Sequence, residues 1–250
     1  MEKLLNWHKE SALSERPSQP KNADTIADEL AIAATTFVKS GMKVGLGAGR
    51  TAARGIEILA QRVANEGLDI VCVAASDRAE DLAHEKGLKI IDFAMLEELD
   101  ILIDGADAVD HKMHVMKGSR GAMTRERILC WAAKQTVFMV DGNKVAEDQI
   151  GSDTPLPIAV MAFGLVSTRK ALRHIGINGV IRQDMDGQLF ITDNGNLILD
   201  ATLHGSENLA QLASELNDIP GVIDHGLFID EADIILIENE NGEIETLNRN

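Results

Sequence analysis

The sequence predicts an α/β protein with a parallel sheet and a smaller α+β domain. Strand-like apolar segments alternate with helix-like segments from Asp24 to Asp141, and this alternation typically produces a parallel sheet with crossover helices. After Asp153 the pairs Asp186-Gly187 and Asn194-Gly195 replace the crossovers, and such pairs favour tight antiparallel turns.

The first 22 residues are expected to form a polar leader outside the fold, because Pro17, Ser18 and Pro20 interrupt any regular pattern. We expect residues 23–153 and 228–250 to form the catalytic sheet domain. Residues 154–227 should form the small α+β domain.

Each expected strand in the sheet domain is followed by a helix or a turn. Asp77 and Glu80 have the capping-box spacing, and Gly87 is placed to end the helix that Asp77 opens. The expected elements are a helix from Asp24 to about Ser40, strand 43–46, helix 51–65, strand 70–75, a helix between Asp77 and Gly87, strands 89–92 and 100–103, helix 122–134 and strand 137–141.

The small domain is expected to have a βαββαβ-like order. Its expected elements are strand 157–161, helix 167–176, two short strands around 184–187, another before Asn194, and helix 206–217. Two further apolar strands, 225–229 and 233–238, are expected to return to the first sheet.

Composition excludes several function classes. The chain has 250 residues, 45% of them hydrophobic, and a formal net charge of -16, so it lacks the basic face that nucleic acid binding requires. No apolar run reaches the roughly 20 residues of a membrane span, and the polar N-terminus does not resemble a signal peptide. We therefore expect a cytoplasmic protein that binds neither nucleic acid nor membrane.

Cys72 and Cys130 lie in apolar stretches and are expected to be buried.

A glycine-rich segment from Gly45 to Ala52 joins a predicted strand to a predicted helix. Such a junction presents free backbone N–H groups to an anion, which predicts a phosphate site. Two alternatives remain open. Gly47-x-Gly49-x-x-Ala52 with Asp77 also fits a loose dinucleotide pattern, and the loop could be a packing turn only.

Carboxylates and a lysine follow in positions suited to proton transfer. Asp104 and Asp107 come at the end of a predicted strand, where open α/β sheets bind ligands. Proton transfer beside a carbonyl needs a base and a positive charge for the enediolate oxygen, and Glu126 and Lys117 fit these roles. No histidine spacing suggests a metal site, although His111 and His114 are three residues apart.

These segments together resemble the ribose-5-phosphate isomerase A family. The resemblance rests on Val44-Gly-Leu-Gly-Ala-Gly-Arg-Thr51, Asp104-Gly-Ala-Asp107, Lys117 with Glu126 nine residues later, and Lys144. Further segments between Pro155 and Phe228 also resemble the family. It implies a Rossmann-like sheet domain with an inserted ferredoxin-like domain. It also implies a homodimer or homotetramer, no cofactor and no metal, and aldose–ketose isomerisation of a small phosphorylated sugar through an enediolate.

The resemblance also implies roles for individual residues. Glu126 resembles the family's general base, Lys117 and Asp104 its charge-stabilising and hydroxyl-handling partners, and Asp107 a substrate ligand. The residues expected to bind substrate are Ala48, Gly49, Arg50, Thr51, Gly105, Ala106, Gly118, Ser119, Arg120 and Lys144.

Two loops depart from the family pattern. Gly47-Ala-Gly-Arg-Thr51 stands where the family has Gly-Thr-Gly-Ser-Thr, and Lys117-Gly-Ser-Arg120 where it has Lys-Gly-Gly-Gly. Arg50 and Arg120 could therefore bind phosphate through bidentate guanidinium contacts. The alternatives are an isomerase of another sugar phosphate and a non-catalytic sugar-phosphate-binding protein.

Overall fold

The computed structural model describes residues 28–204 and 208–249. The predicted leader, residues 1–22, lies outside the described residues, as do the predicted starts of the first and last helices.

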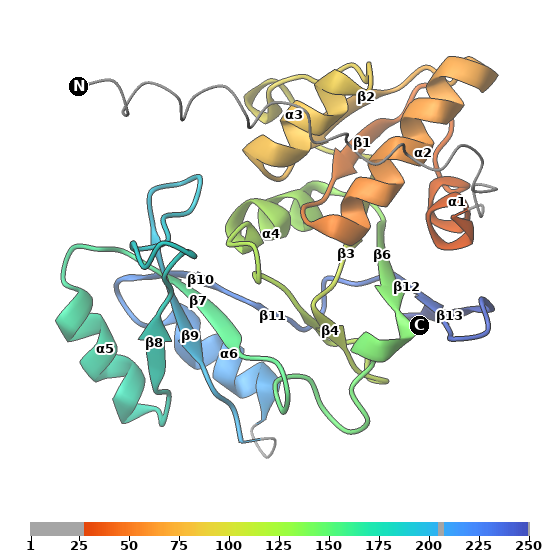
Figure 1. Ribbon diagram of the computed structural model, residues 1–250. Coiled ribbons are helices and arrows are strands. Elements are labelled where there is room, and N and C mark those ends of the chain that lie inside the picture. Colours follow the sequence, from red (N-terminus) through yellow and green to blue (C-terminus); the bar gives the residue numbers. More distant parts are fainter. Residues whose placement is uncertain (1–27, 205–207, 250) are drawn as a thin grey trace, which may run out of the picture.

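A six-stranded sheet runs from the top of the molecule down its right-hand side in Figure 1. All neighbouring strands in it are parallel except the pair β12–β13. In spatial order the strands are β13 (Ile244–Asn248), β12 (Ile234–Glu238), β6 (Thr136–Asp141), β3 (Ile101–Gly105), β1 (Lys43–Leu46) and β2 (Val71–Ala74). The α/β prediction is confirmed.

Helices cover both faces of this sheet because its strands are apolar on both sides. In β6, Val137 and Met139 belong to one core cluster, whereas Phe138 and Val140 belong to the other. The first cluster is covered by α1 (Glu29–Thr35), α2 (Arg50–Glu66) and α3 (Asp77–Glu85), and the second by α4 (Met123–Ala132). Successive side chains of a strand point to opposite faces of the sheet, so one strand contributes side chains to both cores.

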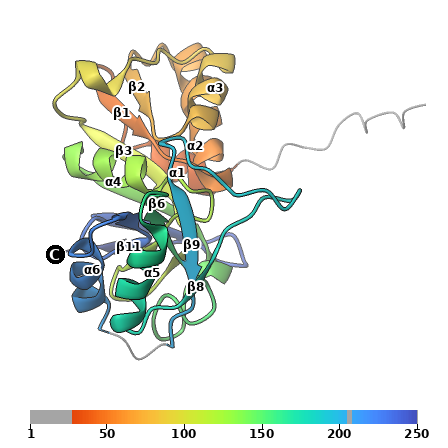
Figure 2. The same cartoon turned by 90° about the vertical axis from the view of Figure 1, so that its left-hand side faces the viewer.

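A four-stranded antiparallel sheet lies below the first sheet, and Figure 2 shows α5 and α6 in the same part of the molecule. Its spatial order is β10 (Val222–His225), β7 (Leu156–Val160), β9 (Leu197–Ala201) and β8 (Gly179–Ile181). With α5 (Leu165–His174) and α6 (Leu209–Asn217), the chain order is the predicted βαββαβ. The predicted boundaries at residues 154 and 227 stay a prediction.

A small three-stranded sheet links the two larger ones. Its strands are β11 (Leu227–Phe228), β5 (Val115–Met116) and β4 (Ala108–Val109). Strand β5 ends directly before Lys117, whose backbone N–H donates to the carbonyl of Gly226 at 2.9 Å. This sheet therefore fixes the backbone from which Lys117 projects.

Several predicted elements are wrong in the sheet domain. The first helix ends at Thr35 instead of near Ser40, because the hydroxyls of Thr35 and Thr36 bond back to the carbonyls of the preceding turn. The predicted strand 89–92 is only an isolated bridge between Cys72 and Ile90. Ser76, rather than Asp77, caps α3, and its side chain accepts from the N–H of Ala79.

The turns of the small domain are present, but the strands predicted around them are wrong. Isolated bridges join Gln183 to Leu189 and Ile191 to Leu197, so these segments form turns with single bridges rather than ladders. The segment 225–229 does not return to the first sheet, because its residues pair within the two smaller sheets. The segment 233–238 does return, as β12 beside β6. Strands β4, β5, β9 and β13 were not predicted.

Both cysteines are buried and free, as predicted. Burial raises the pKa of the Cys72 thiol to about 12, so this residue behaves as a small apolar side chain. None of the helices in the described ranges is long and apolar enough to cross a membrane.

Candidate active site

Three loops meet at the carboxyl ends of β1 and β3. They are residues 47–51, which lead into α2, residues 104–107, which begin with the last two residues of β3, and residues 117–121 before α4. Contact between the 47–51 loop and the 104–107 loop requires a glycine at position 47. A Cβ on Gly47 would lie 1.9 Å from an oxygen of Asp104, so only glycine lets the carboxylate approach this backbone.

The amine of Lys117 lies between two carboxylates. Lys117 Nζ is 2.9 Å from Asp104 Oδ2, 2.9 Å from Glu126 Oε1 and 2.6 Å from the carbonyl oxygen of Gly105. The exposed fractions of these three side chains are between 0% and 4%. The amine donates a hydrogen bond to the Gly105 carbonyl and forms ion pairs with the two carboxylates. We refer to Asp104, Lys117 and Glu126 as the Lys117 cluster.

Backbone donors fix the other oxygen of Asp104. Asp104 Oδ1 accepts from the N–H groups of Gly105 at 2.7 Å and Ala48 at 3.1 Å. The carboxylate thus joins the 47–51 loop to the 104–107 loop. Asp104 Oδ2, which forms the ion pair with Lys117, and Glu126 Oε2 are both buried without a hydrogen-bond partner among the described residues. The glutamate is therefore held through one oxygen only.

The position of Glu126 on α4 separates it from the neighbouring arginines. Arg125 pairs with Asp77 at 2.7 Å, and Arg127 pairs with Asp224 at 2.8 Å. Successive residues of a helix point in different directions, so Glu126 alone faces Lys117. Glu126 is therefore not a solvated carboxylate paired with an adjacent arginine.

Burial controls the ionisation of the Lys117 cluster. Burial raises the pKa of Glu126 to about 8, although the nearby Lys117 charge acts in the opposite direction. The pKa of Asp104 is also raised, again chiefly by burial. Burial alone would lower the pKa of Lys117, but the charges of Asp104 and Glu126 outweigh it and raise that pKa. Lys117 is therefore cationic, and Glu126 can hold or release a proton near neutral pH.

The remaining predicted residues lie around this cluster. Asp107 does not contact Lys117 directly; its carboxylate accepts from the N–H and hydroxyl of Ser119. Lys144 Nζ donates to Thr51 Oγ1 at 3.2 Å and to the carbonyl of Ala106 at 3.0 Å. Arg50 and Arg120 are exposed. The Cβ position of Gly49 lies 4.0 Å from Arg120 Cγ, so the loops carrying these arginines are adjacent.

Two residues near the site were not predicted. The carbonyl of Gly226 holds the backbone of Lys117, and the guanidinium of Arg182 contacts the 117–121 loop. Gly226 lies in the stretch from Pro155 to Phe228 that also resembles the family, and this resemblance could have indicated it. Arg182 lies 63 residues from Ser119, and no motif marks it.

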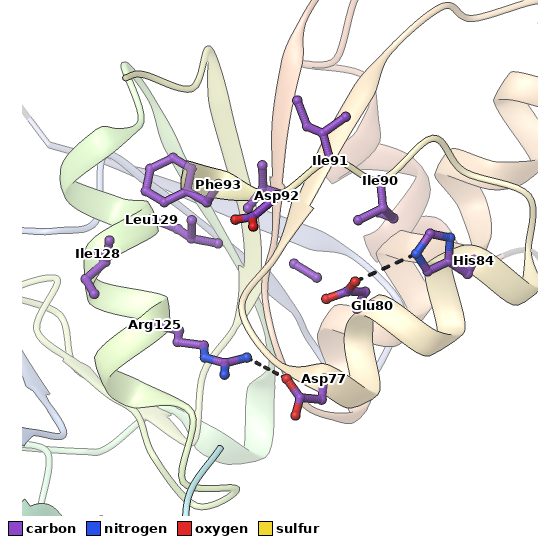
Figure 3. A pocket seen from close by; sticks show the side chains of 12 residues that line it. Asp77, Glu80, His84, Ile90, Ile91, Asp92, Phe93, Arg125, Ile128 and Leu129 are labelled. Carbon is purple, nitrogen blue, oxygen red and sulfur yellow. Dashed lines mark hydrogen bonds and ion pairs between the residues drawn. The ribbon is translucent and has the colours of Figure 1, made fainter. Parts of the chain in front are cut away.

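A cavity of about 470 Å³ lies between α3 and α4 (Figure 3). Its walls include Asp77, Glu80, Phe93, Arg125 and Leu129, and none of the residues predicted for isomerisation or sugar-phosphate binding lines it. Figure 3 shows Arg125 reaching across it to Asp77. The cavity is therefore distinct from the Lys117 cluster, where the charged groups contact one another directly.

The described residues hold no group of three or more histidines, cysteines, aspartates or glutamates that could bind a metal ion. His114 instead pairs with Asp110, with 2.9 Å between Nδ1 and Oδ2. The Asp110 carboxylate also accepts from the N–H groups of Lys112 and His114, so it stabilises the turn before β5.

Known proteins resemble this chain over most of its length. The family model for ribose 5-phosphate isomerase A (phosphoriboisomerase A) matches residues 71–242. A ribose-5-phosphate isomerase A of Gluconobacter oxydans is 43% identical over 211 residues, covering 84% of this chain and 90% of the relative.

Solved structures agree with the sequence relatives. A D-ribose-5-phosphate isomerase in complex with phospho-erythronic acid has a TM-score of 0.84 at 32% identity, covering 88% of this chain and 96% of that one. The ribose 5-phosphate isomerase A of Methanocaldococcus jannaschii has a TM-score of 0.83 at 32% identity, with the same coverage of 88% and 96%. Sequence and fold together show that this chain belongs to the ribose-5-phosphate isomerase A family.

Proposed function

We propose that this chain interconverts ribose 5-phosphate and ribulose 5-phosphate. The observation that carries the proposal is the buried amine of Lys117 held between the carboxylates of Asp104 and Glu126. Isomerisation requires a base that can accept and return a proton, beside a fixed positive charge. Family membership supports the choice of substrate.

In the proposed reaction, Glu126 takes the proton from C2 of the open-chain aldose. The electron pair moves toward the C1 carbonyl oxygen and forms an enediolate, whose negative charge is stabilised by Lys117. Asp104 transfers the hydroxyl proton between O2 and O1. Glu126 then returns its proton to C1, which yields the ketose without net gain or loss of electrons. A base whose pKa is near the working pH can perform both transfers, and the raised pKa of Glu126 meets this requirement.

The phosphate is proposed to bind at the N-terminus of α2. Gly49 is the N-cap residue there and provides no side-chain cap, so the first-turn N–H groups of the 17-residue helix are available to an anion. Arg50 and Arg120 lie on adjacent loops and would add guanidinium contacts. Asp107, Lys144 and the backbone of residues 105–106 and 118–119 are proposed to bind the sugar.

The substrate assignment is tested by isomerisation assays over a panel of phosphorylated and free sugars. We expect ribulose 5-phosphate from ribose 5-phosphate at a rate well above that of a Glu126→Gln control. If another sugar phosphate is converted while ribose 5-phosphate is not, the substrate assignment fails. If none is converted, the chain is not an isomerase.

Arg50→Ala is expected to weaken binding of phosphorylated ligands by about 10-fold or more, because charge-assisted hydrogen bonds contribute ~1.5–3 kcal/mol. Binding of the unphosphorylated sugar should change little. The measurement is the Kd of both ligands by calorimetry. Arg78→Ala is the matched control, since Arg78 is also an exposed arginine in the first turn of a helix. Equal weakening for both ligands would exclude a phosphate role.

The rate should depend on pH through Glu126. The base must be deprotonated to act, so kcat/KM is expected to rise with pH and reach half its maximum near the pKa of about 8. The substrate phosphate titrates near pH 6. The part of the pH–rate profile above pH 7 is therefore the part assigned to Glu126. Circular dichroism at each pH is the control for an intact fold. A rate that stays flat from pH 6 to 9 would show that Glu126 is already ionised.

We also propose a cytoplasmic homodimer or homotetramer that binds no nucleic acid. The net charge of -16 supports the absence of nucleic acid binding, and the family resemblance supports an oligomer. Light scattering coupled to size-exclusion chromatography would measure the assembly, and a mass near 27.1 kDa would reject an oligomer.

A further inference from the structure

Two side chains hold the same peptide group of the 117–121 loop from opposite sides. Asp107 Oδ2 accepts from the N–H of Ser119 at 2.8 Å. Arg182 Nη1 donates to the carbonyl of Gly118 at 3.0 Å. These N–H and C=O groups belong to one trans peptide unit, in which they point in opposite directions. The orientation of this peptide is therefore fixed by an acid from the loop after β3 and by an arginine from beyond β8.

The same guanidinium nitrogen also orients the next peptide group. Arg182 Nη1 donates to the carbonyl of Ser119 at 2.8 Å. The N–H of Arg120 lies in that peptide group and so points away from Arg182. Arg182 thus determines which way two successive backbone N–H groups of the loop are directed.

Arg182 is itself held in place. Its Nε and Nη2 atoms bind the two oxygens of Asp200 on β9, a bidentate arrangement that fixes the guanidinium plane. The guanidinium lies 5.5 Å from the ring centroid of Phe190. That ring occupies the space beside Gly121, where a Cβ would lie 2.5 Å from it. The exposed fraction of the Arg182 side chain is only 14%.

We propose that Arg182 is a positioning residue for substrate binding, acting through the backbone of Gly118, Ser119 and Arg120. This inference rests on the proposed function, in which the 117–121 loop contacts the sugar phosphate. The Lys117 amine is fixed separately by Asp104, Glu126 and the Gly105 carbonyl. Loss of Arg182 should therefore affect substrate affinity much more than the proton-transfer step.

The test compares Arg182→Met and Arg182→Lys with the wild-type chain. Both variants should raise KM for ribose 5-phosphate about tenfold and leave kcat within about threefold, because only binding contacts are lost. Lysine keeps the charge but cannot donate to two carbonyls and a bidentate carboxylate together. The Lys variant therefore decides the question if the Met variant does not fold. The pH dependence of kcat should match that of the wild type in both.

The matched control is Arg169→Met, which removes an arginine of α5 whose guanidinium donates to the carbonyl of Gly179 at 3.3 Å. Its KM should be unchanged. A lowered Tm with unchanged KM in the Arg182 variants would indicate a purely structural role and overturn the inference. The Kd of phospho-erythronic acid, the ligand of a solved relative, is measured alongside. This Kd measurement needs no turnover, so it tests the role of Arg182 even if the wild type fails to isomerise ribose 5-phosphate. Such a failure would reject only the proposed function.

Discussion

Glu126→Gln is expected to lower kcat for ribose 5-phosphate by roughly 10²–10⁴-fold, the usual contribution of a general base. Glutamine keeps the shape of the side chain, and its carbonyl oxygen can still accept from Lys117, which is 2.9 Å from Glu126 Oε1 in the wild type. It cannot accept the proton from C2. Substrate affinity should therefore remain close to wild type, so the loss should be confined to turnover.

Steady-state kinetics measures the change in kcat, and calorimetry with phospho-erythronic acid measures the affinity. Glu80→Gln is the matched control, since Glu80 is an exposed helical glutamate whose closest partner is His84 at 3.8 Å. The control should be fully active. A kcat for Glu126→Gln within threefold of wild type would remove Glu126 from the mechanism.

The sheet domain could be predicted well because its signals are local. Strand 43–46 and the helix after it follow from an apolar run, a glycine loop and amphipathic spacing, all within a few residues. Strands β4 and β5 have two residues each, too short to leave a periodic pattern. The turn at Asp184–Gly187 indicated a hairpin, but a turn signal does not determine how many flanking residues pair.

The Lys117 cluster could be predicted because strand ends and helix starts bring its members together in any fold of this kind. The contacts that hold the loop around this cluster could not be predicted. Arg182 reaches the 117–121 loop from the segment after β8, and Gly226 reaches it from between β10 and β11. Nothing in the local sequence specifies such long-range contacts. Asp107 was expected to contact substrate, whereas its carboxylate is bonded to Ser119; its role in substrate binding stays a prediction.

Lys117→Met should have the other large effect, because it removes the only cation that contacts both Asp104 and Glu126 among the described residues. Loss of enediolate stabilisation should lower kcat by about 10²–10³-fold. The fold should also lose about 3–5 kcal/mol of stability, because two buried carboxylates remain without their charge partner. Lys112→Met is the matched control, since Lys112 is exposed and its loss should change stability by less than about 0.5 kcal/mol.

The stability loss of Lys117→Met should depend on pH with a definite sign. Without the ammonium group, burial holds the pKa values of Asp104 and Glu126 above those of the unfolded chain. The folded state then binds protons more tightly, so its stability is greatest at low pH and falls as pH rises through the folded-state pKa values. Urea denaturation at pH 5.5 and pH 8 measures this, and the deficit relative to wild type should be larger at pH 8. An equal deficit at both pH values would mean that loss of the ammonium group leaves proton binding by the folded state unchanged, and Lys117 would then not control the ionisation of Asp104 and Glu126.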